Sequence, residues 1–114
     1  HGQRRNYLMP VPPADVRRIA RNALARREVY GRGGTAVGVA RARDLAAGRN
    51  LSDETIQRMV SFFARHGASE DSKKARADRT SAAAIAWGLW GGNPGRSWAG
   101  SELRKIERRN NASQ

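Results

Sequence analysis

The chain has no cysteine and few aromatic residues, with three Trp, two Phe and two Tyr among 114 residues. Without cysteine there is no disulfide framework, no thiolate zinc site and no cysteine nucleophile, so the fold must rest on packing. No uncharged run is long enough to cross a bilayer, and we expect no membrane association. Away from the first residue the chain has only one histidine, His66, and its carboxylates do not recur at catalytic or metal-ligand spacing. We therefore expect no catalytic residues, no metal, no cofactor and no enzymatic activity.

Acidic residues are also scarce, because 22 Lys and Arg face 10 Asp and Glu and give a formal net charge of +12. Almost all of the cations are arginine, whose planar guanidinium binds phosphate oxygens through two parallel hydrogen bonds. Residues 1–50 hold 11 arginines and three acids, a net +8, whereas residues 51–114 hold 11 basic and seven acidic residues, a net +4. The composition predicts a nucleic-acid partner, DNA before RNA, with contacts concentrated in the first half. The alternative is a basic surface that is only solvated.

Apolar residues recur at helical spacing, and no segment has the pattern of a strand. We expect an all-α fold, a compact bundle of four to five short helices. The first three expected helices cover residues 14–30, residues 36 to about 47 after a Thr35 cap, and the residues between a Ser52 or Asp53 cap and Gly67, which ends the helix. A fourth covers residues 82–90 after a Ser81 cap, and a last short helix begins at Ser97 or Trp98. The two helices that flank residues 48–51 fit either a helix-turn-helix pair or an ordinary helical hairpin.

The composition also suggests how the chain is divided. We expect a flexible basic arm at residues 1–12, a single helical domain at residues 13–107 and a frayed tail at residues 108–114. Within the domain, residues 68–80 are charged and offer almost nothing to bury, which predicts a polar loop.

Ten basic side chains from the expected helices and the polar loop are candidate phosphate contacts. They are Arg17, Arg21, Arg32, Arg41, Arg43, Arg49, Arg58, Arg65, Lys73 and Lys74. The tryptophans could stack on bases, but in a domain this small they are needed for the core. We expect Trp98 to be the exception and Phe62 to be less inward than Phe63. Arg96 and Trp98 then form a candidate anchor pair for a protein partner.

Two blocks, GRGGTAVGVARARDLAAGRNLSDETIQRMVSFFARHG and AIAWGLWGGNPGRSWA, resemble a small uncharacterised basic module that recurs in proteins of tailed bacteriophages. That module is sometimes joined to virion-associated or capsid-maturation chains. This sequence departs from it at Asn93, where the module has an acid, and at Ala83 and Ala84. The resemblance implies a phage origin, a non-catalytic auxiliary role, and a location in the host cytoplasm or the phage virion. It adds an alternative function, a virion structural or assembly module that docks another protein through residues 86–99, which we call the Gly/Trp segment.

Overall fold

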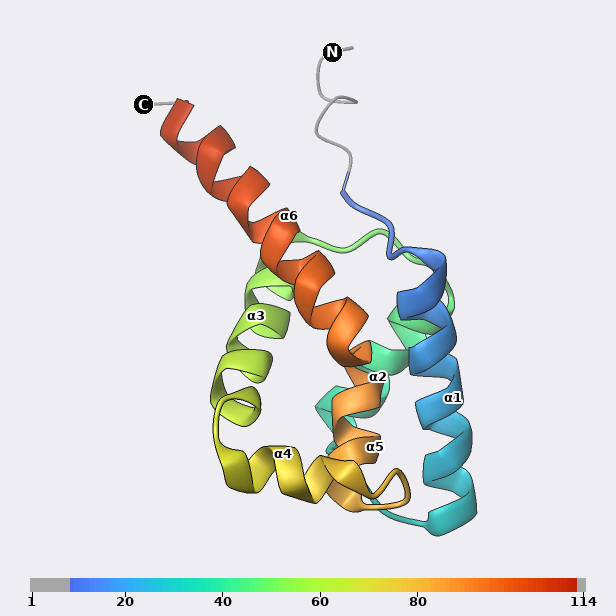
Figure 1. The fold of residues 1–114 in the computed structure, drawn as a ribbon. Coiled ribbons are helices and arrows are strands. Elements are labelled where there is room, and N and C mark those ends of the chain that lie inside the picture. Colours follow the sequence, from blue (N-terminus) through green and yellow to red (C-terminus); the bar gives the residue numbers. More distant parts are fainter. Residues whose placement is uncertain (1–8, 113–114) are drawn as a thin grey trace.

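The computed structural model describes residues 9–112, and within them it contains six α-helices and no strand. In chain order these are α1 (Ala14–Tyr30), α2 (Ala36–Ala46), α3 (Asp53–Gly67), α4 (Glu70–Ala77), α5 (Ala82–Leu89) and α6 (Gly92–Ala112). Figure 1 shows them gathered into one small bundle. The all-α prediction is confirmed. None of these helices combines the length and the apolarity needed to span a membrane.

Side-chain caps define where four of the helices begin. The hydroxyls of Thr35, Ser52, Ser69 and Ser81 each accept a hydrogen bond from a backbone N–H three residues further on. Each cap satisfies one of the N–H groups that a helix start leaves without a partner. The predicted caps of α2, α3 and α5 are therefore confirmed, whereas the cap of α4 was not predicted.

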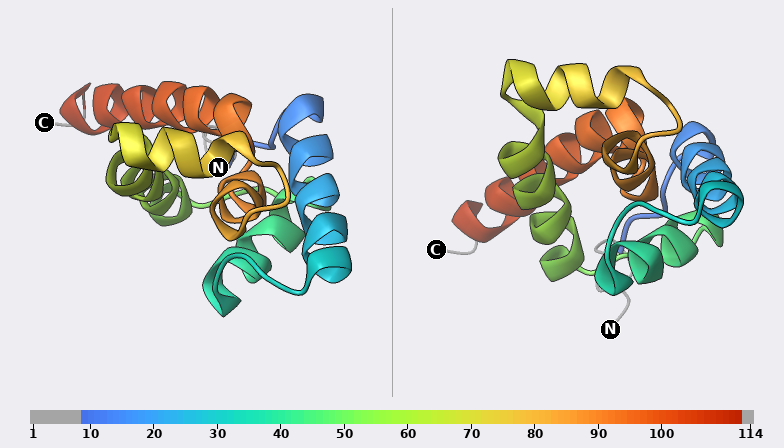
Figure 2. Two further views of the ribbon diagram at one scale, coloured as in Figure 1. Left: turned by 60° about the horizontal axis from the view of Figure 1, so that its bottom comes forward. Right: turned by 90° about the horizontal axis from the view of Figure 1, so that it is seen from below.

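The most apolar helix, α5, lies at the centre of the bundle and packs on α1, α2, α4 and α6. The two views of Figure 2 show α5 surrounded by these helices. Trp87 and Trp90 are buried, as expected for core residues. Phe62 is buried together with Phe63, although it is slightly the more exposed of the two, at 8% against 2%. Its ring stacks on that of Trp90, with centroids 4.6 Å apart and an angle of 10° between the planes.

Glycines of the Gly/Trp segment let α5 and α6 approach other backbone and side-chain atoms closely. A Cβ on Gly88 would lie 2.8 Å from the Cβ of Ala23 in α1, and one on Gly95 would lie 2.6 Å from the carbonyl oxygen of Trp90. These distances leave no room for a side chain. The helix α6 begins at Gly92, with Pro94 in its first turn where proline is tolerated, and not at Ser97 or Trp98 as predicted.

Three predicted boundaries are corrected by the structure. Residues 70–77 of the expected polar loop form α4, and the expected frayed tail is helical as far as Ala112. In the expected flexible arm, the Leu51 N–H donates to the carbonyl of Pro10, and the side chain of Asn50 donates to that of Met9. The end of that segment is therefore tied to the domain, while residues 1–8 lie outside the described part.

The helices α2 and α3 do not form a helix-turn-helix pair. The helix α2 packs on α1 and α5, whereas α3 packs on α6 and makes fewer contacts with α4. An ion pair between Arg109 and Asp53 adds to the α3–α6 contact. Because α2 and α3 make no substantial contact with each other, both the helix-turn-helix and the helical-hairpin interpretations are wrong.

Candidate nucleic-acid interface

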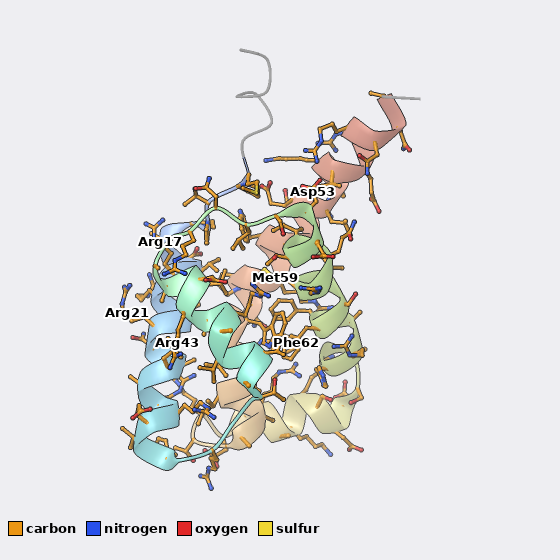
Figure 3. The ribbon with its side chains drawn as sticks, turned by 180° about the vertical axis from the view of Figure 1, so that it is seen from behind. Arg17, Arg21, Arg43, Asp53, Met59 and Phe62 are labelled. Carbon is orange, nitrogen blue, oxygen red and sulfur yellow. The ribbon has the colours of Figure 1, made fainter. Side chains whose placement is uncertain are left out.

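Three of the predicted arginines lie along one side of the packed pair α1 and α2. Arg17 and Arg21 are four residues apart, about one helical turn, and so share a face of α1. Arg43 lies beside them on α2, as Figure 3 shows. Within the described residues none of the three forms an ion pair with a carboxylate. We call Arg17, Arg21 and Arg43 the α1–α2 arginine face.

Gly48 helps to hold Arg17 in this position. It follows α2 with a φ of 68°, and a Cβ placed there would lie 3.1 Å from Cδ of Arg17. The guanidinium of Arg17 donates a 2.8 Å hydrogen bond to the carbonyl of Pro12. The side chain thus lies across the junction of the two helices with part of its hydrogen-bonding capacity still free.

Arg49 extends the basic surface past the end of α2, but its charge is partly offset. Its guanidinium lies 3.1 Å from a carboxylate oxygen of Asp44. The side chain is 68% exposed, so the ion pair is weak and can reorganise around a ligand. Arg49 is a secondary contact at this face.

Arg41 is not a phosphate contact, and its assignment to this group is wrong. The residue is only 9% exposed, since α2 packs with Arg41, Ala42 and Leu45 turned inward. Its guanidinium lies 3.2 Å from Asp44 and 5.8 Å from the ring centroid of Trp90. Burial lowers the pKa of Arg41, while the charge of Asp44 acts in the opposite direction. A phosphate cannot reach this group from solvent.

The remaining predicted cations do not join the α1–α2 arginine face. Arg32, just beyond the far end of α1, donates a 2.8 Å hydrogen bond to the carbonyl of Thr80. Arg58 and Arg65 belong to α3, where Arg58 pairs with Glu54. Lys73 and Lys74 belong to α4, where Lys73 pairs with Glu70. The predicted basic residues therefore occupy separate helices and form no single patch.

The sequence did not predict the positions of two further arginines, Arg76 and Arg26, which both lie against α5. Arg76 of α4 lies over Trp87, with its guanidinium carbon 3.8 Å from the ring centroid, and donates a hydrogen bond to the carbonyl of His66. Arg26 of α1 is half-buried beside Gly88, and burial together with the charge of Arg79 lowers its pKa. Both arrangements depend on how separate helices pack on each other, which no local pattern reveals.

Of the predicted docking pair, Arg96 and Trp98, only Arg96 is fully accessible to a protein partner. Arg96 is exposed near the end of α3, whereas Trp98 is half-buried against the core. Most of the Gly/Trp segment around them is used for packing within the domain.

No family model matches the chain, and neither a curated protein nor a solved structure matches it. The resemblance to a phage module therefore stays a prediction. Within residues 9–112, no three His, Cys, Asp or Glu side chains gather closely enough to hold a metal ion.

Proposed function

We propose that the protein binds nucleic acid without catalysing a reaction, and that DNA phosphates contact the α1–α2 arginine face. The observation that supports this proposal is that Arg17, Arg21 and Arg43 share one side of two packed helices and have no carboxylate partner among residues 9–112. Arg21 and Arg43 are exposed and Arg17 is half-buried, and guanidinium groups held at the surface of a packed helix pair suit a regularly spaced row of phosphates.

The charge distribution favours the same half of the molecule. Residues 1–50 carry a net +8, twice the +4 of residues 51–114, and supply all three arginines of the face. At physiological ionic strength fields from exposed charges fall off over about 8 Å, so local clustering matters more than the total charge. Most of the affinity would be ionic, with little reading of base sequence.

A salt titration tests the proposal. Anisotropy of a fluorescent DNA duplex is measured from about 50 to 200 mM salt, and each phosphate contact should add roughly 0.9 to the slope of log K against log salt. Replacing Arg21 and Arg43 by Gln should lower that slope by roughly 2. The matched control replaces Arg104 and Arg108, two exposed arginines of α6, and removes the same charge.

A flat slope for the unaltered protein would disprove nucleic-acid binding by phosphate contacts. Equal losses in the two double variants would show that binding depends on total charge and not on the α1–α2 arginine face. Competition by single-stranded DNA and by an RNA hairpin of equal length tests the preference for DNA.

The resemblance to the phage module bears on where this activity would operate. We propose the host cytoplasm or the phage virion, where the ligand would be phage or host DNA. The alternative, docking of a virion protein through Arg96 and Trp98, has less support because Trp98 is half-buried.

A further inference from the structure

A groove of about 970 Å³ opens between α3 on one side and α5 with the start of α2 on the other, and α4 closes one end. It opens because the backbone of α3 runs along α6, and α3 reaches α5 mainly through ring contacts, Phe63 with Trp87 and Phe62 with Trp90. Phe62, labelled in Figure 3, reaches from α3 across this gap to stack on Trp90. We call this hollow the α3–α5 groove.

The two long walls of the groove differ in chemistry. The wall formed by α5 presents the small apolar residues Ala83 and Ala86, and Val37 at its edge is 58% exposed. The wall formed by α3 presents Arg58 and Arg65, together with Glu54, which pairs with Arg58. The two arginines are seven residues apart, about two helical turns, so they lie along the same side of α3. An apolar strip therefore runs beside two cations, of which Arg58 is already paired, and α4 adds one carboxylate, Asp71, to the lining.

The aromatic rings of the groove already have planar groups against them. The ring of Trp90 stacks on Phe62, and the guanidinium of Arg41 lies over it. Arg76 lies over Trp87, with its guanidinium carbon 3.8 Å from the ring centroid. A nucleobase binds such platforms through a free ring face, so this arrangement disfavours stacking of single-stranded nucleic acid.

We infer that the α3–α5 groove binds an amphipathic helix of another protein, with small apolar residues against α5 and acidic residues facing Arg58 and Arg65. In helix-in-groove recognition an amphipathic helix lays its apolar face on an apolar strip, and charges at the border select the partner. Arg65 has no carboxylate partner among the described residues, so a partner's carboxylate would give it one. This inference is independent of the proposed DNA binding, which uses other helices.

A second copy of this chain does not fit the groove by charge. The end of α6, which projects from the bundle in Figure 1, carries more basic than acidic residues, among them Arg104, Lys105 and Arg108. Like charges placed against Arg58 and Arg65 would oppose binding. The occupant is therefore acidic, unlike the rest of this chain with its net charge of +12.

A designed peptide serves as the probe. It has about five helical turns, with Ala and Leu on one face and Glu at positions seven apart on the flank, and its partner peptide carries Lys in place of Glu. Binding is followed by the anisotropy of a label on the peptide and by backbone amide shifts of the full chain. We expect the Glu peptide to bind at least about tenfold more tightly than the Lys peptide and to shift α3 and α5 resonances.

Charge exchange on the protein provides the decisive control. Arg65→Glu should weaken the Glu peptide about tenfold and strengthen the Lys peptide, a reversal that loss of folding cannot produce. Arg104→Glu on α6 makes the same charge change away from the groove and should leave the ratio of the two affinities unchanged. Ala86→Trp should fill the groove and abolish binding, and its matched control is Ala25→Trp on the exposed side of α1.

Three results would overturn the inference. These are equal affinity for the two peptides, no effect of Arg65→Glu on their ratio, and absence of binding at about 1 mM peptide. Displacement of the peptide by a short single-stranded oligonucleotide would assign the groove to nucleic acid instead. The variant that replaces Arg21 and Arg43 should bind the peptide normally, so failure of DNA binding and failure of the groove are distinguishable.

Discussion

The indole nitrogen of Trp87 donates a 2.9 Å hydrogen bond to Oδ1 of Asn93, which joins the last turn of α5 to the first turn of α6. The chain reverses between them through Gly91 and Gly92, whose φ angles are 104° and 64°. The tryptophan is buried, so its N–H depends on this one acceptor. The contact shows that the Gly/Trp segment stabilises the packing of α5 against α6.

Substitution of Asn93 tests this contact. Asn93→Ala should lower the free energy of unfolding by about 1 kcal/mol because the indole N–H loses its acceptor. Asn93→Asp should be as stable as the unaltered protein or more so, because it keeps an acceptor and places a negative charge in the first turn of α6. Urea unfolding checks both variants, and equal destabilisation by Ala and Asp would contradict the assignment.

The close packing at Gly95 gives a second prediction. Gly95→Ala should lower the free energy of unfolding by at least about 2 kcal/mol, because the new Cβ would lie 2.6 Å from the carbonyl oxygen of Trp90. The matched control is Gly100→Ala in the same helix, where the nearest atom is the flexible end of Arg104 at 3.7 Å. That change should stabilise by about 0.5–1 kcal/mol through helix propensity. Thermal or urea unfolding that ranks the two variants in the opposite order would show that α6 does not pack as described.

Arg41 and Arg43, two residues apart on α2, should respond oppositely to replacement by Met. Arg43→Met should lower the salt slope of DNA binding by roughly 0.9, whereas Arg41→Met should leave it unchanged. The reason is that Arg43 is exposed and Arg41 is buried against Trp90. Replacement of a buried ion by an apolar side chain of similar volume often costs little stability, so Arg41→Met should remain folded. Circular dichroism and the salt titration check these outcomes, and loss of DNA binding in a folded Arg41→Met protein would refute the assignment of Arg41 to the core.

The helices that could be predicted from the sequence are those that bury an apolar stripe. The helix α1 was predicted with its observed bounds, residues 14–30, because its apolar spacing is regular and Gly31 ends it with a φ of 63°. In contrast, α4 buries no residue. It is held by the Ser69 cap and by Arg76 lying over Trp87, a contact between separate helices that leaves no periodicity in the sequence.

The start of α6 and the binding surfaces were harder to predict for related reasons. The sequence Gly-Gly-Asn-Pro-Gly is typical of a turn, yet Gly91 and Gly92 make the turn and Pro94 already belongs to the helix. The inward position of Arg41 depends on which face α2 turns toward α1 and α5, and this is set by tertiary packing. The α3–α5 groove exists because the backbone of α3 follows α6 while its phenylalanine rings reach across to the tryptophans at α5, which is a property of the whole arrangement.

Asp78, between α4 and α5, gives a prediction on pH. Its carboxylate accepts hydrogen bonds from the backbone N–H and the hydroxyl of Thr80, and these bonds, the backbone one first, lower the pKa of Asp78. Because the folded pKa is below the unfolded value of about 3.9, the stabilisation is present above that pH and is lost as the pH falls through the folded pKa. A carboxyl ¹³C titration should find the Asp78 midpoint below about 3.9.

Thr80→Val separates the two donors to Asp78, because it removes the hydroxyl and keeps the backbone N–H. The variant should raise the Asp78 midpoint only part of the way to the unfolded value, since the backbone bond has the larger effect. Asp78→Asn removes the carboxylate, so its contribution to the free energy of unfolding should be absent at every pH. The unaltered protein loses the same contribution in acid. The difference in free energy of unfolding between the two proteins should therefore shrink as the pH falls below about 4. A midpoint at or above the unfolded value in the unaltered protein would show that the carboxylate does not hold the α4–α5 connection.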